Sequence, residues 1–348
     1  MGYPLQYHEE EFQPFEWTWT VRHHEHLLRP DAACINSVLG VIGRCQALYP
    51  EDEFRLYYAT IESTHLHMVC ATRDPVVAAN VKRHLATNIA KEIQALRNLD
   101  RGGIWARRCR SIPILGTLDD RLKYLLAHGY KSQIVARITQ WPGLDMLKAV
   151  LKGATLTGTW YNRVAYGAEL WSWKQHKRVL KGKLKGRERR SALKAYFAQR
   201  PRLRDFAIEY PVRLTTPPTM AGLDEAAQRS AWQRLVDEAE VKYAPELKKS
   251  GAKRPVLGLE RVLKTSPRKK PLVPKKRTPA PWVHVKESAE YGAWLKRYWT
   301  FVGTFRGYMA RLAQSTVELI ELPWNGWAPP ALAQLRASAP WVELAPLA

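Results

Sequence analysis

The sequence predicts an α+β fold in which helices pack on an antiparallel sheet. Three runs, 16–23, 54–61 and 64–71, have the alternation or the aromatic and β-branched composition of strands. Only a short connection separates the second run from the third, so we expect these two strands to pair antiparallel. Helical signals lie between and after the strands, which is the arrangement of a layered α+β domain.

Two helices are predicted from their caps. Asp31 is a candidate N-cap for a helix over 32–48, in which the apolar residues form one stripe. Asp74 and Pro75 open a second helix that ends near Leu96. Asp74 is its cap, and the proline takes the first helical position, where its missing N–H costs nothing.

A fourth strand is expected near 108–114, followed by a third helix that Thr117 can cap. The predicted order is strand, helix, strand, strand, helix, strand, helix. This is the ferredoxin-like order, which places the helices of the motif on one face of its antiparallel sheet. A basic, mainly helical extension follows it toward the C-terminus.

His65 and His67 are the most informative residues for function. Because they lie two residues apart on a strand, their side chains point to the same face of the sheet, while Leu66 turns into the core. Two imidazoles side by side on a rigid strand are the arrangement that a divalent metal needs. Alone this signal is weak, because a pair of strand histidines is often one packed and one solvated ring.

A tyrosine and a third histidine strengthen the signal. Tyr124 and His128 are four residues apart in the predicted third helix and therefore share a face of it. The segment 102–108, Gly-Gly-Ile-Trp-Ala-Arg-Arg, lies between the histidine pair and this helix. Over roughly residues 15–145 the order of these elements resembles the single-tyrosine HUH transposases, the IS200-like and REP-associated tyrosine transposases in particular.

The resemblance implies an HUH nuclease-type fold and a metal-dependent transposase, which is an endonuclease and strand transferase for DNA transposition and recombination. It implies that His65, His67 and His128 bind Mg²⁺ or Mn²⁺ as cofactor. It also implies that Tyr124 attacks single-stranded or hairpin DNA and forms a 5′-phosphotyrosine. An imidazole as the third ligand favours Mn²⁺ or a softer metal over Mg²⁺.

Three alternatives stay open. Tyr130, six residues after Tyr124, is a rival nucleophile if the helix ends before it. His24 and His26 form a second pair on one strand face, although a solvated strand end is the simpler interpretation. The chain also departs from the family, with Ser63-Thr64 before the first histidine and His128-Gly129 after the tyrosine, where relatives have Pro-Asn and Asn-Pro. A domesticated, non-catalytic nucleic-acid-binding protein that retains the HUH fold is therefore the alternative function.

Charge is the second line of inference. The net charge of +23 implies a polyanionic partner, and DNA is the first candidate. Residues 174–204 hold 13 Lys or Arg and one Glu, and residues 241–280 hold 13 Lys or Arg and two Glu. These two segments carry the whole net excess, so we expect them to supply most of the attraction for DNA.

The candidate DNA-binding residues are Arg107, Arg108, Lys174, Lys177, Arg178, Lys181, Lys183, Lys185, Arg187, Arg189 and Arg190. No run reaches the ~18 apolar residues of a membrane-spanning helix, and the N-terminus lacks a signal layout. The four scattered cysteines contain no Cys-x-x-Cys pair, which favours a reducing interior. We therefore expect a cytoplasmic, nucleoid-associated protein with no membrane partner, and leave a homodimer open.

The predicted organisation has five parts. An N-terminal tail over 1–15 precedes a catalytic domain over 16–145. A basic, mainly helical extension over 146–248 follows, and its segment 174–204 is expected to be one charged helix. A linker rich in Pro, Lys and Arg over 249–281 is predicted to be a flexible tether. The chain ends in a C-terminal helical segment over 282–348, whose aromatic stripe we expect to pack on the catalytic unit or on a second subunit.

Overall fold

The structure is a computed structural model. It describes residues 8, 10–99, 102–183, 186–251, 256–269 and 283–313. Its main sheet has four strands in the order β2-β3-β1-β4, and every pair is antiparallel. The strands are β1 Pro14–Thr20, β2 Phe54–Glu62, β3 His65–Thr72 and β4 Arg110–Pro113.

The first two helices begin where their caps predict. In α1 (Ala32–Leu48) the Asp31 carboxylate accepts a hydrogen bond from the backbone N–H of Cys34, with N···O 3.0 Å. In α2 (Pro75–Leu96) the Asp74 carboxylate accepts from two backbone N–H groups, each at 2.8 Å. These side chains satisfy donors that would otherwise be orphaned in the first turn. The ferredoxin-like order of elements and the α+β fold class are confirmed.

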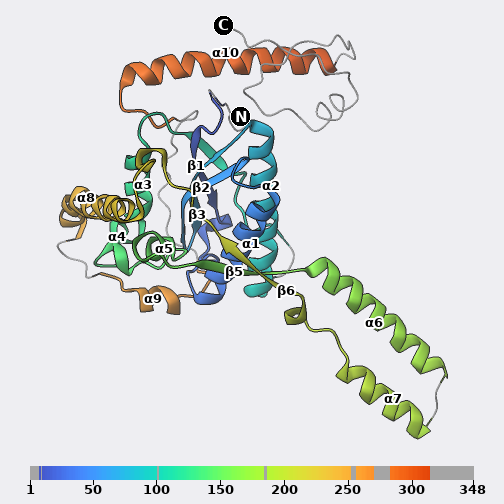
Figure 1. Ribbon diagram of the computed structural model, residues 1–348. Helices are drawn as coiled ribbons and strands as arrows, with labels where there is room; N and C mark the ends of the chain where they lie inside the picture. Colours follow the sequence, from blue (N-terminus) through green and yellow to red (C-terminus); the bar gives the residue numbers. More distant parts are fainter. Residues whose placement is uncertain are drawn as a thin grey trace.

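The two faces of the sheet are covered by different helices (Figure 1). Trp17 of β1 pairs with Met68 of β3, and α2 lies over this face, with Lys82 Nζ 5.4 Å from the Trp17 ring. His67 pairs with Thr18 and points to the opposite face. That second face is covered by α3 (Leu118–Leu126), α4 (His128–Lys131), α5 (Met146–Lys152) and α8 (Glu225–Gly251).

One hydrophobic core joins the sheet to the predicted extension. Trp232, Leu235 and Val236 of α8 belong to the same buried cluster as Trp17 and Leu66, and the Trp232 ring lies 5.8 Å from that of Tyr58. The sheet thus shares its core with a helix well beyond residue 145.

A second, two-stranded sheet packs on α1. It consists of β5 (Leu156–Tyr161) and β6 (Ala207–Val212), paired antiparallel. The contact depends on glycine, because a Cβ at Gly40 would lie 2.2 Å from the carbonyl oxygen of Thr159, and one at Gly158 would lie 2.1 Å from the Gly40 nitrogen. No larger residue fits at either position without moving the helix and the strand apart.

The basic run 174–204 is not one helix, which corrects the prediction. It falls within a pair of helices, α6 (Arg163–Lys183) and α7 (Gly186–Ala198), which lie between β5 and β6 and project from the body (Figure 1). The rings of Trp173 and Tyr196 stack at 4.2 Å with an interplanar angle of 12°. Each of these two side chains also hydrogen-bonds the backbone carbonyl of the other, so the pair clamps the two helices together. We call this pair, residues 163–198, the arm.

The prediction of a flexible tether over 249–281 is wrong for residues 256–269. They form α9 (Leu259–Lys264), whose Val262 is buried against Val135 and Trp141. The backbone N–H groups of Leu257 and Gly258 also donate to the carbonyls of Gln133 and Ile134, both at 2.9 Å. The remaining residues of the linker, 252–255 and 270–282, lie outside the described residues.

The last described element is α10 (Ser288–Ala313), on which Trp294, Tyr298, Phe301 and Val302 form a small buried cluster against Leu115 and Val283. Its aromatic stripe thus packs on the body of the same chain. The remaining short helices are η1 Arg22–His24, η2 Ile138–Gln140, η3 Leu203–Phe206 and η4 Pro218–Met220. Within the described ranges no helix combines the length and apolar character needed to cross a membrane.

Candidate active site

The predicted histidine pair lies on the face of the sheet that α3 and α4 cover. His65 and His67 of β3 have their ring centroids 4.6 Å apart. His67 is 6% exposed. The same register brings the end of β2 next to them, since Glu62 pairs with His65 and Thr60 with His67. Strand period and antiparallel register together create this polar patch on an otherwise apolar sheet.

His128 completes a triad. It begins α4 and is buried, with its ring centroid 4.3 Å from that of His67 and 5.6 Å from that of His65. One ligand atom from each of the three imidazoles lies within 4.8 Å of the others. The three predicted metal-binding histidines therefore converge in a cluster that could hold a single ion.

Hydrogen bonds fix which nitrogen each ring offers. The Nδ1–H of His67 donates to Glu16 Oε1 at 3.0 Å, and the Nδ1–H of His128 donates to the backbone carbonyl of Tyr124 at 3.1 Å. The Nδ1 of His65 shares a hydrogen bond with Thr64 Oγ1 at 2.8 Å. With Nδ1 engaged in all three rings, Nε2 is left to bind the ion, which is how outer partners orient metal-binding imidazoles.

The electrostatics of the triad suit a cation. Burial lowers the pKa of His128 to about 3 and lowers the pKa of His65 well below its ordinary value. Both rings are therefore neutral at physiological pH, and only the neutral imidazole has a lone pair for a metal. The site needs no deprotonation of these two rings before it binds an ion.

Glu16 is the buried carboxylate behind the triad. Burial acts to raise its pKa, but hydrogen bonds from His284 and His67, together with the charge of Arg121, hold the pKa well below its ordinary value. Arg121 binds the second oxygen, Oε2. An ionised acceptor at His67 Nδ1 increases the basicity of that ring and so its strength as a ligand.

Glu62 is a fourth candidate ligand that sequence analysis missed. Its Oε2 lies 3.4 Å from Nε2 of His65, on the side where the three free nitrogens meet. A carboxylate at that distance fits the ligand set of a divalent ion, and it adds the negative charge that three neutral imidazoles lack. Its position opposite His65 follows from the strand register, which could have identified it.

Tyr124 lies beside the triad. Its ring centroid is 4.6 Å from that of His128 and 6.3 Å from that of His67. The guanidinium of Arg121 stands over the Tyr124 ring at 4.2 Å, and Lys131 Nζ is 4.9 Å away. Burial, and then the charge of Glu16, raise the pKa of Tyr124, whereas Arg121 opposes the rise. The phenolate therefore needs further positive charge before it can act as a nucleophile.

Tyr130 faces another part of the molecule. It follows His128 on α4 and packs against the cluster of Val135 and Trp141. The two tyrosines are thus separated by the joint at Ala127, where α3 ends and α4 begins. Only Tyr124 has described ring contacts with the histidines.

The second histidine pair does not form a ligand cluster. His23 and His24 have positive φ angles of 50° and 52°, and they end β1 in a short 3-10 turn rather than extending the strand. Among the described residues, the triad is the only group of three or more metal-ligating side chains close enough to share an ion. The extended pairing expected of His24 and His26 is therefore wrong.

The predicted DNA-binding residues fall in two places. Arg107 and Arg108 are exposed in the loop before β4. Lys174 on α6 and Arg190 on α7 are exposed on the arm. The backbones of Lys177, Arg178, Lys181, Lys183, Arg187 and Arg189 also belong to the arm helices, whereas Lys185 lies outside the described residues.

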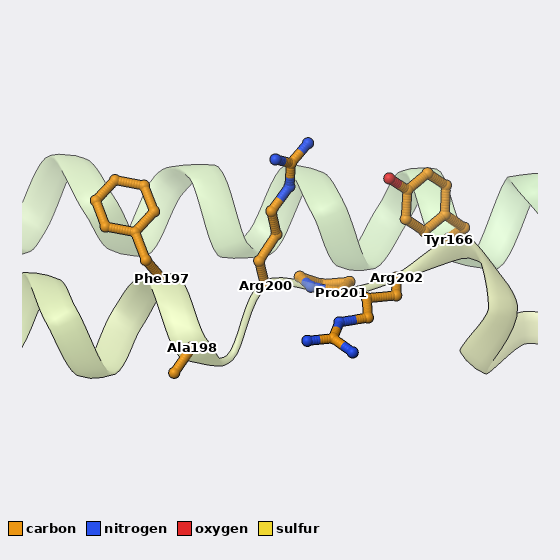
Figure 2. A pocket seen from close by; sticks show the side chains of 6 residues that line it. All are labelled: Tyr166, Phe197, Ala198, Arg200, Pro201 and Arg202. Carbon is orange, nitrogen blue, oxygen red and sulfur yellow. The ribbon is translucent and has the colours of Figure 1, made fainter.

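A shallow pocket lies at the base of the arm (Figure 2). It is lined by the aromatic rings of Tyr166 and Phe197 and by the chain that leaves α7, with Arg200 and Arg202 pointing to opposite sides of that chain. This is an open, basic surface and not an enclosed ligand cavity. The triad and the arm are thus distinct features at different ends of the molecule.

No protein-family model matches the chain, and no curated protein sequence matches it. Among solved structures, a REP-associated tyrosine transposase bound to a REP hairpin is similar, with 18% identity and a TM-score of 0.35, over 44% of this chain and 87% of that one. A candidate transposase from Deinococcus radiodurans R1 is similar with 9% identity and a TM-score of 0.26, over 32% of this chain and 85% of that one. Both likenesses are too distant to assign this chain to a family.

Proposed function

We propose that this protein is a metal-dependent DNA transposase that cleaves and rejoins DNA strands through Tyr124. The observation that carries the proposal is the convergence of one tyrosine and three oriented imidazoles on one face of the sheet. Nucleophile and ligands come from elements about sixty residues apart, and each imidazole has its outer nitrogen occupied. A structural cluster of histidines has no need of three free Nε2 atoms beside a phenol.

The chemistry follows from these positions. The Tyr124 hydroxyl oxygen attacks a backbone phosphorus in line, the new oxygen–phosphorus bond forms, and the bond to the 3′ oxygen breaks. The products are a 5′-phosphotyrosine and a free 3′-hydroxyl, and the same steps in reverse rejoin a strand without ATP. A bound Mg²⁺ or Mn²⁺ would polarise the scissile phosphate and neutralise charge that develops on it. Arg121, over the phenol ring, favours the phenolate.

Three imidazoles favour Mn²⁺ over Mg²⁺, because Mg²⁺ prefers oxygen ligands and water. Glu62 would moderate that preference by adding a carboxylate oxygen. The cofactor we propose is therefore Mn²⁺, with Mg²⁺ as the weaker alternative. DNA is the substrate, in single-stranded or hairpin form, and a protein with this activity works in the cytoplasm at the nucleoid.

The arm is the proposed DNA-holding element. It carries the densest run of cations in the chain, and the described ones, Lys174 and Arg190, are exposed. Exposed cations without acidic neighbours release counterions from DNA when they bind, which gives salt-dependent affinity without sequence preference. Arg107 and Arg108, in the loop before β4, would hold the strand closer to the triad.

A covalent adduct tests the proposal. Full-length protein is incubated with 5′- or 3′-labelled hairpin and single-stranded oligonucleotides, with Mn²⁺, with Mg²⁺ or with a chelator, and resolved under denaturing conditions. The proposal requires a metal-dependent band that retains the label 3′ of the cut. Tight DNA binding with no adduct under any of these conditions would instead support the non-catalytic DNA-binding alternative.

A further inference from the structure

A short strap from the C-terminal part of the chain extends the edge of the main sheet. Residues 283–285 run beside the chain that leaves β4, and His284 forms a parallel bridge with Ile114. The backbone N–H of His284 donates to the Pro113 carbonyl at 2.9 Å, and the N–H of Leu115 donates to the His284 carbonyl at 2.8 Å. Because its N–H and C=O are both paired with the sheet edge, the backbone of His284 has a fixed position.

The side chain of His284 reaches the carboxylate behind the metal triad. Its Nε2 lies 2.9 Å from Glu16 Oε2, while Glu16 Oε1 accepts from His67 Nδ1 at 3.0 Å. Arg121 also binds Oε2. Glu16 is therefore held by three donors from three separate elements, and it is 3% exposed. A carboxylate held in this way cannot rotate without breaking a charge-assisted hydrogen bond.

The strap is held in place by α10. Trp294 and Tyr298 are buried, 2% and 3% exposed, in the small cluster that also contacts Leu115 and Val283. The hydroxyl of Thr117, at the start of α3, adds a hydrogen bond to the His284 carbonyl at 3.2 Å. The anchor and the histidine are thus one unit, joined to the sheet at the strand that lies next to Glu16 on β1.

We propose that His284 is a positioning residue of the metal centre, which acts through Glu16 to fix the ring of His67. The inference rests on the proposed function, because it assumes that the triad binds a metal. Without His284, Oε2 loses a buried donor, the carboxylate gains freedom to turn toward Arg121, and the Nδ1–H of His67 loses its fixed acceptor. The C-terminal segment thereby becomes part of the site, although 268 residues separate the two side chains.

The charge balance supports this role over simple packing. Arg121 already supplies one full positive charge to Glu16, so neutrality does not require another group. His284 instead adds a directional donor to the carboxylate that orients a ligand. Outer-sphere partners of metal ligands, when removed, typically cost about 10- to 100-fold in metal affinity or activity.

The test measures metal affinity in the full chain without DNA. Mn²⁺ is titrated by calorimetry into wild type, His284→Ala and His284→Gln at neutral pH. Glutamine places an amide N–H near the position of Nε2 and keeps the donor to Glu16. We expect His284→Ala to weaken Mn²⁺ binding about 10- to 100-fold and His284→Gln to restore affinity to within about threefold of wild type.

The control variant is Thr117→Val, which removes a hydrogen bond to the same strap without touching Glu16. It should lower the melting temperature while the Mn²⁺ affinity stays at the wild-type value. Equal Mn²⁺ affinity in wild type and His284→Ala would overturn the role of His284 alone. A glutamine variant as weak as the alanine variant would overturn it too, since the donor would then not matter. No Mn²⁺ binding by wild type would overturn both this inference and the proposed metal centre.

Discussion

The triad and the arm place their charged groups in opposite environments. At the triad, Glu16 is buried and meets Arg121, His67 and His284, so each charge has a partner. On the arm, residues 174–204 hold 13 cations and one Glu, and the described cations are exposed. The arm has few acidic groups with which to pair. The site is a fixed, largely dry arrangement, whereas the arm offers unpaired charge to the solvent.

The difference shows how one chain can separate chemistry from attraction. Catalytic groups need fixed geometry and low dielectric, which a packed sheet and its covering helices supply. Attraction of a polyanion needs cations that are free to exchange counterions, which a protruding helical pair supplies. Changes at the triad should therefore abolish chemistry and spare affinity, and changes on the arm should do the reverse. The predictions below test this separation, from the largest expected effect to the smallest.

The largest effect is expected at the nucleophile. Tyr124→Phe removes only one hydroxyl and should abolish the covalent adduct, a loss of at least about 10³-fold, while affinity for DNA changes less than about twofold. Tyr130→Phe is the matched control and should keep the adduct, because Tyr130 packs against Val135 and Trp141 and not against the triad. Adduct yield and fluorescence anisotropy on the same labelled hairpin measure the two properties. An adduct in both variants would remove the tyrosine mechanism.

The next effect is expected at the metal ligands. His65→Ala and His67→Ala should each reduce cleavage and Mn²⁺ affinity by about 100-fold or more, since each leaves the coordination shell incomplete. His128→Ala should cost less, because water and Glu62 can complete the shell. Calorimetry with Mn²⁺ checks the order, and DNA affinity in chelator should be the same for all three variants. Unchanged Mn²⁺ affinity in a His65/His67 double variant would refute the metal site.

A moderate effect is expected from the arm. The strands β5 and β6 are paired up to Tyr161 and Ala207, and the N–H of Asn162 donates to the Phe206 carbonyl at 3.0 Å. Residues 164–205 can therefore be replaced by two glycines as a short turn, with the two-stranded sheet intact. Arg163, which binds both carboxylate oxygens of Glu92, at 3.0 and 2.6 Å, is kept.

This armless variant should bind DNA about 10- to 100-fold more weakly at moderate salt, and the slope of log affinity against log salt should become shallower by about 0.9 for each duplex phosphate released or 0.7 for each single-strand phosphate. Adduct formation at saturating DNA should persist. Hairpin preference over a scrambled strand should also persist, because contacts to phosphates carry no sequence information. Salt slopes equal to those of wild type would mean that the arm does not touch DNA.

The predictable part of this structure is the local part. The caps Asp31 and Asp74, the strand period that aligns His65 with His67, and the helical spacing of Tyr124 and His128 all depend on residues within four positions of one another. Each was confirmed as a structural feature. The roles of these residues in catalysis and metal binding stay predictions.

The missed residues are those whose partners are distant. Glu16, Arg121 and His284 meet only because the sheet register places β1 beside β3 and the strap joins β4 from the far end of the chain. No local pattern marks them. The arm was missed for a related reason, because a basic run with helical character does not show where it folds back, and the stack of Trp173 on Tyr196 forms across 23 residues.

The smallest effect concerns pH, and it separates the buried site from the exposed arm by stability alone. The pKa of His128 is about 3 in the folded chain because the ring is buried, whereas in the unfolded chain it lies near 6.5. Between these values the unfolded state binds a proton that the folded state does not, so the free energy of unfolding falls as pH falls from about 6.5 toward 3. The limiting slope for one group is about 1.4 kcal/mol per pH unit. His128→Gln, measured by urea unfolding in chelator between pH 6.5 and 5, should lower the slope by up to that amount. His176→Gln on the arm, whose side chain is exposed, should leave the slope unchanged. A wild-type slope retained in His128→Gln would mean that the ring takes up a proton in the folded state, and that the triad is wetter and more open than its burial indicates.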